Sequence, residues 1–182
     1  MIVIISYIIF QLFLIILLLL IFLELFQDFV LGKVPYIPTP IKIIEELLHK
    51  INVSPKIVYD LGAGDARFLI AFKRKFPSTK VIGFENSLLP YLYGKIKILY
   101  YNLDIKLLHK NFFKQNISQA DLIFCFLGPE QMKRLEKKFD EELKKDAIII
   151  SNTFTIPHWH IKEKYILGTN KSAWNKIYIY QK

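Results

Sequence analysis

The sequence predicts an α/β domain with a mostly parallel sheet, preceded by one apolar N-terminal helix. Two observations predict the domain. Short apolar segments alternate with amphipathic ones from residue 56 to residue 152, and the chain then closes on two strand-like segments around a glycine-containing turn. This alternation is typical of parallel strands covered by helices on both faces, and the closing pair predicts an antiparallel hairpin at the edge. A third observation sets the first helix apart, since residues 2–23 are almost entirely apolar.

The composition is that of one folded domain with an unevenly placed charge. The chain has 182 residues, of which 53% are hydrophobic, and a formal net charge of +9. Residues 1–32 contain no lysine or arginine, so all 25 basic residues lie beyond them. The single cysteine, Cys125, excludes an intramolecular disulfide framework and a cysteine-based zinc cluster. It lies in an apolar segment, where we expect a buried thiol that packs like a small hydrophobic residue.

The first segment has the length of a membrane span. A helix over residues 2–23 reaches about 33 Å at roughly 1.5 Å per residue, against about 30 Å for a hydrocarbon core. A cleaved signal peptide needs a basic start, a shorter apolar region and a small-residue cleavage site, and this segment has none of them. We therefore expect an uncleaved transmembrane anchor over residues 1–28. Because Lys33, Lys42 and Lys50 follow it, the positive-inside rule predicts a cytoplasmic C-terminal domain.

A proline-rich linker over residues 29–40 separates this anchor from the domain, which we expect over residues 41–182. Prolines 35, 38 and 40 favour an extended chain. Thr39 is expected to act as the N-cap of the next helix, with Pro40 at the first helical position. Apolar residues at positions 41, 44, 47 and 48 give that helix one buried face.

The remaining elements follow from hydrophobic period and from turn residues. Pro129 starts a helix whose apolar face repeats at Met132, Leu135, Phe139 and Leu143, and Glu130 lies in its first turn. The expected helices are 41–51, 66–76, 88–101 and 129–144. The expected strands are 56–61, 80–85, 105–110, 121–127, 147–152, 161–167 and 174–180.

The turn after the first expected strand has the features of a ligand-binding loop. It reads Asp60-Leu-Gly-Ala-Gly-Asp-Ala-Arg67, and Gly62 and Gly64 allow a tight turn with close backbone approach to a ligand. The helix that follows supplies unpaired N–H groups. Glu85 ends the second strand 21 residues after Gly64, where an acid accepts hydrogen bonds from ribose hydroxyls. Together these features predict a ligand that contains adenosine.

The charges of this turn distinguish between adenosine cofactors. A dinucleotide fingerprint requires a third small residue at the position of Arg67, and Asp60 would repel its pyrophosphate. The P-loop pattern Gly-Lys-Ser/Thr is absent. S-adenosylmethionine has a cationic ammonium group and no phosphate, so it suits an acid before the glycines.

These motifs resemble the seven-stranded, Rossmann-like S-adenosylmethionine-dependent methyltransferases. Further segments are similar to one branch, the membrane-anchored family that contains the mitochondrial lysine methyltransferases of the adenine nucleotide translocase and the ATP synthase c-subunit, with their prokaryotic relatives. The segments that carry this likeness are Pro35-Tyr-Ile-Pro-Thr39, Gly83-Phe-Glu-Asn86, Leu127-Gly-Pro-Glu-Gln-Met132, Leu135-Glu-Lys-Lys138 and Phe154-Thr-Ile-Pro-His-Trp159. The resemblance covers residues 30–182 and implies the same fold, with S-adenosyl-L-methionine as cofactor.

The resemblance also implies roles for single residues. Asp60, Gly62 and Gly64 would hold the methionine end of the cofactor, Glu85 the ribose, and Asn111 the adenine amino group. Two positions depart from the family pattern. Ala66 replaces a usual glycine, which narrows the loop slightly, and Asn-Ser-Leu-Leu-Pro at 86–90 replaces an Asn-Pro-Trp type of sequence beside the adenine.

Three residues are candidates for the acceptor side of the site: Tyr36, Thr39 and Glu130. Each also has a structural interpretation, respectively as an interfacial aromatic anchor, a helix cap and a first-turn acid. The segment Gly128-Pro-Glu130 lacks the Asn/Asp-Pro-Pro-Tyr motif of methyltransferases that act on amides or on adenine. That difference disfavours such acceptors.

We therefore expect a single-pass, membrane-tethered methyltransferase whose acceptor is a lysine of a membrane-associated protein. The first alternative acceptor is a lipid or lipophilic small molecule, and the second alternative function is a non-catalytic membrane-anchored binding module. We expect no metal, because His158 and His160 have no evident third ligand, and no nucleic-acid partner, because no reading motif is present.

Overall fold

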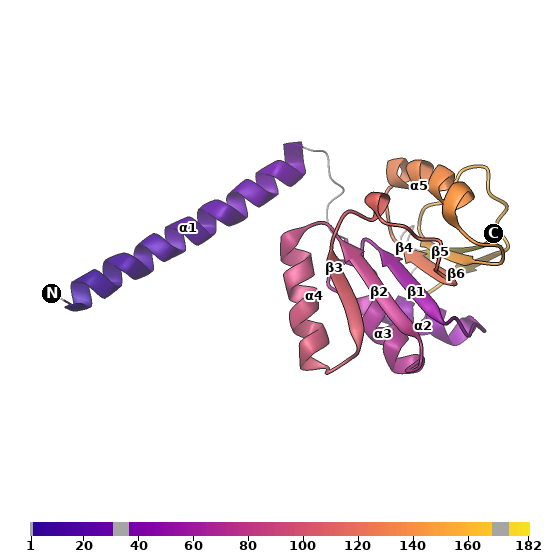
Figure 1. Cartoon of the computed structure of the whole chain (residues 1–182), viewed down its shortest axis with the longest axis horizontal. Helices are drawn as coiled ribbons and strands as arrows, with labels where there is room; N and C mark the ends of the chain where they lie inside the picture. The colour runs from indigo at the N-terminus through magenta and orange to yellow at the C-terminus, as the bar shows by residue number, and fades with distance from the viewer. Residues whose placement is uncertain (1, 31–36, 169–174) are drawn as a thin grey trace. The chain divides into compact units, whose positions relative to one another are not determined.

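The computed structural model describes residues 2–30, 37–168 and 175–182 and divides into two compact units, residues 1–35 and 36–182. Helix α1 (Ile2–Val30) makes up the described part of the first unit (Figure 1). Its residues Ile4–Leu23 are long and apolar enough to cross a membrane, and none of this stretch is buried inside the protein. The helix therefore has the dimensions of a span by length and composition.

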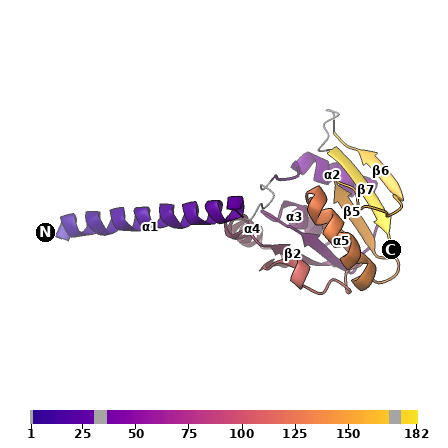
Figure 2. The same cartoon turned by 90° about the horizontal axis from the view of Figure 1, so that it is seen from above.

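The second unit is a seven-stranded sheet with the strand order β3-β2-β1-β4-β5-β7-β6. Strands β1 to β5 are parallel, whereas β7 runs antiparallel to both β5 and β6, as expected for the closing hairpin (Figure 2). The strands are β1 (Ile57–Leu61), β2 (Lys80–Glu85), β3 (Ile105–His109), β4 (Leu122–Cys125), β5 (Ile148–Asn152), β6 (Glu163–Ile166) and β7 (Lys176–Gln181). The predicted α/β class and hairpin are confirmed.

Four helices and a short 3-10 turn complete the described part of this unit. They are α2 (Ile41–Lys50), α3 (Arg67–Lys75), α4 (Leu88–Tyr100), η1 (Phe112–Lys114) and α5 (Pro129–Glu142). Two strands are three residues shorter than predicted, because 121–127 and 161–167 each form a strand of only four residues. The excess residues lie in the loops that lead away from the sheet.

Two apolar layers cover the two faces of the sheet. On one face α2, α3 and α4 pack against Val58, Val81, Leu122 and other strand residues, and Phe68 stacks on Phe124 with ring centroids 3.9 Å apart. Helix α5 covers the other face (Figure 1). It packs there through Met132, Leu135 and Phe139, all fully buried. The predicted apolar face of α5 is thus confirmed.

Cys125 lies at the end of β4 and is completely buried, as predicted. Its Sγ atom is 3.9 Å from the Met132 Sδ atom, and burial raises the pKa of the thiol to about 12. A thiol with so high a pKa is almost wholly protonated at neutral pH, so it acts as a packing residue.

The strand order reverses at the centre of the sheet, between β1 and β4. The chain passes from β1 to β2 and β3 on one side, then returns to β4 on the other side of β1. In such open sheets ligands bind beyond the carboxyl ends of the strands, at the point where the strand order reverses. The topology therefore places the binding edge at the ends of β1, β2, β4 and β5.

Candidate functional site: a carboxylate-lined edge at the ends of β1 and β2

The loop after β1 is fastened to the end of β2. Gly62 and Gly64 have φ values of +84° and +53°, in the left-handed region that favours glycine. The backbone N–H groups of Gly62 and Ala63 both donate to the Phe84 carbonyl oxygen at 2.9 Å. A Cβ atom on Gly62 would lie 3.0 Å from a methyl carbon of Leu127, so the space there is also restricted.

Ala66 completes this loop in an unusual backbone conformation. It is fully buried and has a φ of +62°, in the left-handed region, at the N-cap position of α3. Left-handed backbone costs a residue with a Cβ atom about 1–2 kcal/mol. Alanine in place of the family's usual glycine therefore adds backbone strain at this position. This effect comes in addition to the slight narrowing of the loop that the sequence predicts.

Glu85 holds the same loop from the end of β2. Its Oε2 atom accepts a hydrogen bond from the Gly64 backbone N–H at 2.7 Å, and its Oε1 atom accepts one from the Ser87 N–H at 2.7 Å. Each carboxylate oxygen retains a second lone pair for a ligand. The structure thus gives Glu85 a loop-ordering contact and leaves it able to accept hydroxyl hydrogen bonds.

Asp60 is an acidic residue of the site that no cation of the described residues neutralises. This residue lies at the end of β1, is 3% exposed, and forms no ion pair with the described side chains. Burial, together with the negative charges of Glu85 and Asp65, raises its pKa well above the ordinary value. Such a carboxylate favours a cationic ligand, and the ammonium group of S-adenosylmethionine provides one. The donor set therefore fits this cofactor.

Asp65 has the opposite environment, although it lies five residues from Asp60. Its carboxylate accepts two hydrogen bonds from Arg67, from Nε at 2.8 Å and from Nη2 at 2.8 Å, and one from the Lys97 Nζ at 2.9 Å. Burial raises its pKa, but the hydrogen bonds and charges of Arg67 and Lys97 outweigh that effect and hold the pKa well below its ordinary value. Asp65 is therefore a fixed anion that joins α3 to α4.

Asn111 lies beyond β3, beside the same edge of the sheet. Its Oδ1 atom accepts a hydrogen bond from the Phe113 backbone N–H at 2.9 Å, which caps η1. The next residue back, Lys110, donates its backbone N–H to the Glu85 carbonyl oxygen at 2.9 Å. This position is compatible with the predicted adenine contact, and the capping bond gives the side chain a structural role as well.

The three candidates for the acceptor side differ in their positions and contacts. The expectation that Thr39 caps α2 is wrong: the helix has Pro40 at its N-cap position and no side-chain cap. The Thr39 Oγ1 atom instead accepts a hydrogen bond from the Asn152 Nδ2 at 3.1 Å, and the Thr39 carbonyl oxygen accepts one from the Arg67 Nη1 at 3.1 Å. Glu130 is exposed in the first turn of α5, and Tyr36 lies outside the described residues.

The contact between Thr39 and Asn152 joins segments 113 residues apart in the chain. Thr39 is 5% exposed and Asn152, the last residue of β5, is fully buried. Thr153 follows with a φ of +74°, an outlier for a β-branched residue, and its hydroxyl donates to the Asn152 Oδ1 atom at 3.1 Å. Strain of this kind gathers at functional sites.

Asn152 was not among the site residues predicted from the sequence. Its signal was a polar residue at the end of an apolar strand, but one polar residue at a strand end is common. Its contact depends on the extended segment before α2, which no local pattern places. The same holds for Asp65, whose partner Lys97 is 32 residues away.

The chain is similar to known methyltransferases. Residues 60–163, more than half of the chain, match the family described as the ANTKMT methyltransferase domain. A protein-lysine N-methyltransferase from Saccharolobus islandicus is 33% identical over 138 residues, which cover 71% of this chain and 83% of that protein. The human lysine N-methyltransferase of the ATP synthase c-subunit is 30% identical, with 69% of this chain and 54% of that protein covered.

The chain therefore spans about half the length of the human protein and most of the Saccharolobus one. Among solved structures, an RNA methyltransferase from Salinibacter ruber in complex with S-adenosyl-L-homocysteine superposes with a TM-score of 0.71. That match has 19% sequence identity and covers 80% of this chain and 93% of the other, so it concerns the fold.

Proposed function

This chain belongs to the family of the ANTKMT methyltransferase domain and is an S-adenosylmethionine-dependent methyltransferase, and from this premise we propose that it methylates lysine side chains of membrane-associated proteins. The acceptor class is supported by the likeness to protein-lysine N-methyltransferases over more than two thirds of the chain. The cofactor site is supported by one observation above all, the buried Asp60, whose carboxylate pairs with no cation of the described residues.

Within this proposal the residues of the β1–β2 edge hold the cofactor. Asp60 pairs with its ammonium group, and Glu85 accepts hydrogen bonds from the ribose hydroxyls. Gly62 and Gly64 allow the backbone to approach it, and Asn111 lies on the adenine side. When bound, S-adenosylmethionine supplies a methyl group on a sulfonium sulfur.

On the acceptor side the protein needs mainly to position a neutral amine. A lysine loses its proton more readily in a desolvated pocket, because burial lowers the pKa of an ammonium group. Positioning and exclusion of water then supply most of the acceleration for an in-line displacement. We assign this role to the segment that contains Tyr36 and Thr39, supported by Asn152, with Glu130 at the outer margin.

The apolar helix supports a tether in this proposal. Residues Ile4–Leu23 have the length and composition of one span, and the basic residues Lys33, Lys42 and Lys50 that follow favour a cytoplasmic domain. A tether confines the search for acceptors to the membrane surface and raises their effective concentration.

The experiment that tests this function is transfer of a tritiated methyl group from S-adenosylmethionine to membrane fractions by the full chain. We expect label in protein, released as methyl-lysine on hydrolysis, and loss of that label with Asp60→Asn. Label that extracts into organic solvent would instead assign a lipid or lipophilic acceptor. No label in any fraction, from a chain that binds S-adenosylhomocysteine, would contradict transfer to membrane components.

A further inference from the structure

Helix α4 is apolar on the side that faces solvent. Only Gly94 and Ile98 of this helix are buried against the sheet. On the opposite side Ile96 is 64% exposed, Leu99 80% and Tyr100 81%. A helix that is hydrophobic all round is normally covered all round, in a protein core or in a membrane. The domain covers one side of α4, so we expect the other side to contact a partner.

The exposed side chains form one continuous stripe. At 3.6 residues per turn, the apolar residues of the outer side beyond the first turn occupy about 120° of the helix circumference. They are Leu92, Tyr93, Ile96, Leu99 and Tyr100, and we call them the α4 stripe. Lys95 and Lys97 lie at its two edges, and α4 contains no acidic residue. Contiguous apolar surface of this kind marks an interaction site.

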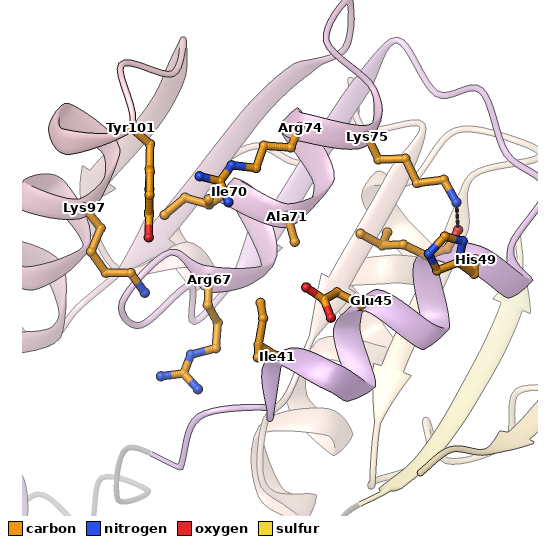
Figure 3. A pocket seen from close by; sticks show the side chains of 11 residues that line it. Ile41, Glu45, His49, Arg67, Ile70, Ala71, Arg74, Lys75, Lys97 and Tyr101 are labelled. Atoms are coloured by element: carbon orange, nitrogen blue, oxygen red, sulfur yellow. Dashed lines mark hydrogen bonds between the residues drawn. The ribbon is translucent and has the colours of Figure 1, made fainter.

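A basic cleft of about 650 Å³ lies beside the stripe, between α2, α3 and α4 (Figure 3). Lys97 and Tyr101 line it from the α4 side, and Ile70 and Ala71 form part of an apolar wall. Arg67, Arg74, Lys75 and His49 also line it, and Glu45 is the one acid among the described lining residues. Lys97 therefore borders the cleft and the stripe, so the two surfaces are continuous.

Several of these cations already have partners. Arg67 and Lys97 bind Asp65, and the Lys75 ammonium group donates to the Leu48 carbonyl oxygen. The Arg74 guanidinium lies 4.1 Å from the centroid of the Tyr101 ring and makes no ion pair with the described residues. Arg74 thus remains as a cation in the cleft, and Lys95 as an exposed cation at the edge of the stripe.

We propose that the α4 stripe and the cleft beside it dock on the surface of a bilayer that contains anionic lipids. Apolar and aromatic side chains flanked by lysines are the pattern of helices that lie in a membrane interface, with ammonium groups at the phosphates. The proposal rests on the proposed tethered function, since helix α1 would bring the domain to such a surface.

Charge favours a bilayer over a second copy of the chain. If two α4 stripes paired with each other, Lys95 of each copy would border the contact, and α4 offers no carboxylate to neutralise it. An anionic lipid surface complements Lys95 and the Arg74 guanidinium of the cleft. Docking would also bear on the site, because Lys97 binds Asp65 in the cofactor loop at 2.9 Å.

The test uses the full chain, one molecule per lipid nanodisc, with a fluorophore that reports local polarity. Cys125 is fully buried, so a cysteine introduced as Leu99→Cys is the reactive one in the described part of the chain. The matched control is Glu141→Cys on α5, on the other face of the sheet, where the side chain is 61% exposed. Discs of phosphatidylcholine alone are compared with discs that also contain phosphatidylglycerol.

We expect the emission at position 99 to shift to shorter wavelength in the anionic discs, and the control at position 141 to stay unchanged. Ile96→Asp in the same background should reduce the shift without changing affinity for S-adenosylhomocysteine. No shift at position 99 in any single-chain disc would overturn the proposal, as would a shift that requires two chains per disc or an added protein.

The same samples separate this inference from the proposed tether. A chain that stays in the disc without a shift contradicts docking of α4 alone. A chain that leaves the discs contradicts the tether, and the label is then read on added anionic vesicles. A shift on these vesicles supports docking, and its absence overturns docking as well.

Discussion

At the scale of single residues, Asp60 lowers the stability of the ligand-free protein at neutral pH and is the proposed partner of the cofactor's ammonium group. Its folded-state pKa is raised by burial and by the charges of Glu85 and Asp65. A raised pKa means that protonated Asp60 is more favoured in the folded ligand-free protein than in the unfolded chain. Asp60 therefore contributes most to stability below its unfolded pKa, and that contribution is lost as the pH rises through the folded pKa.

Asp60→Asn should remove this penalty at neutral pH. We expect the ligand-free protein to unfold at a higher temperature, by about 2–4 °C for each kcal/mol relieved in a chain of this size. S-adenosylhomocysteine should no longer raise the melting temperature of the variant, because the partner of its ammonium group is absent. Thermal unfolding with and without this ligand measures both effects. A variant that melts lower, yet still responds to the ligand, would contradict the role of Asp60.

At the residue scale, the cofactor residues that the sequence predicts belong to one local motif. Asp60, Gly62, Gly64 and Glu85 all fall within one strand–turn–helix–strand unit, and the structure brings them to one edge. Thr39 shows the limit of that approach. A threonine before proline at a helix start is a reasonable cap, but a buried amide from Asn152 competes for its hydroxyl. A contact between such distant segments leaves no trace in the local pattern.

At the scale of elements, Asp65 joins α3 to α4 through Arg67 and Lys97. Its depressed pKa means that the carboxylate stabilises the fold above its ordinary pKa of 3.8, and that this contribution is lost as the pH falls further. Asp65→Asn should cost about 1–3 kcal/mol near neutral pH, because buried charge-assisted hydrogen bonds are lost while the two cations still reach water.

The pH dependence distinguishes this ion pair from simple packing. We expect the difference in unfolding free energy between the wild-type protein and Asp65→Asn to shrink as the pH falls below 3.8. Urea unfolding at a series of pH values measures it. A difference that stays constant with pH would show that the carboxylate charge contributes nothing.

Gly94 sets how closely α4 approaches the cofactor loop. A Cβ atom at this position would lie 2.8 Å from a Leu107 methyl carbon, 3.1 Å from the Asp65 carbonyl carbon and 3.2 Å from the Gly64 carbonyl oxygen. Gly94→Ala should therefore displace the loop or the helix, at about 1–3 kcal/mol for overpacking.

We expect Gly94→Ala to weaken binding of S-adenosylhomocysteine about tenfold, a difference of about 1.4 kcal/mol. The matched control is Lys95→Ala, next in the chain but exposed to solvent, which should leave the affinity unchanged. Calorimetric titration of both variants measures the effect. Equal affinity of Gly94→Ala and the wild-type protein would contradict the close packing at this position.

The elements themselves were largely predictable, because hydrophobic period and turn residues act over a few residues. All seven strands and the domain helices occur where the alternation predicts them. The strand over 121–127 was predicted too long, since apolar residues such as Leu127 also line the loop at Gly62. Helix α4 shows a second limit: an apolar sequence predicts burial, but which side the domain leaves open depends on packing.

At the scale of the whole molecule, one chain contains both a methyltransferase domain and an apolar helix. A tether should affect encounter with acceptors and leave the cofactor site unchanged. Removal of residues 1–35 should therefore preserve affinity for S-adenosylhomocysteine and reduce methylation of membrane proteins, by a factor on the order of 100. Tritium incorporation into membrane and soluble fractions tests this, and equal labelling by both forms of the chain would contradict the tether.

The most direct test of the central claim is calorimetric titration of the full chain in detergent with S-adenosylhomocysteine, in buffers of different ionisation enthalpy. Because binding requires the ionised Asp60, we predict that at pH values below the Asp60 pKa binding releases a proton and the affinity falls about tenfold per pH unit. Asp60→Ala should abolish binding and Glu85→Ala should weaken it. Binding that both variants retain, with no proton release, would contradict the assignment of the cofactor to this edge of the sheet.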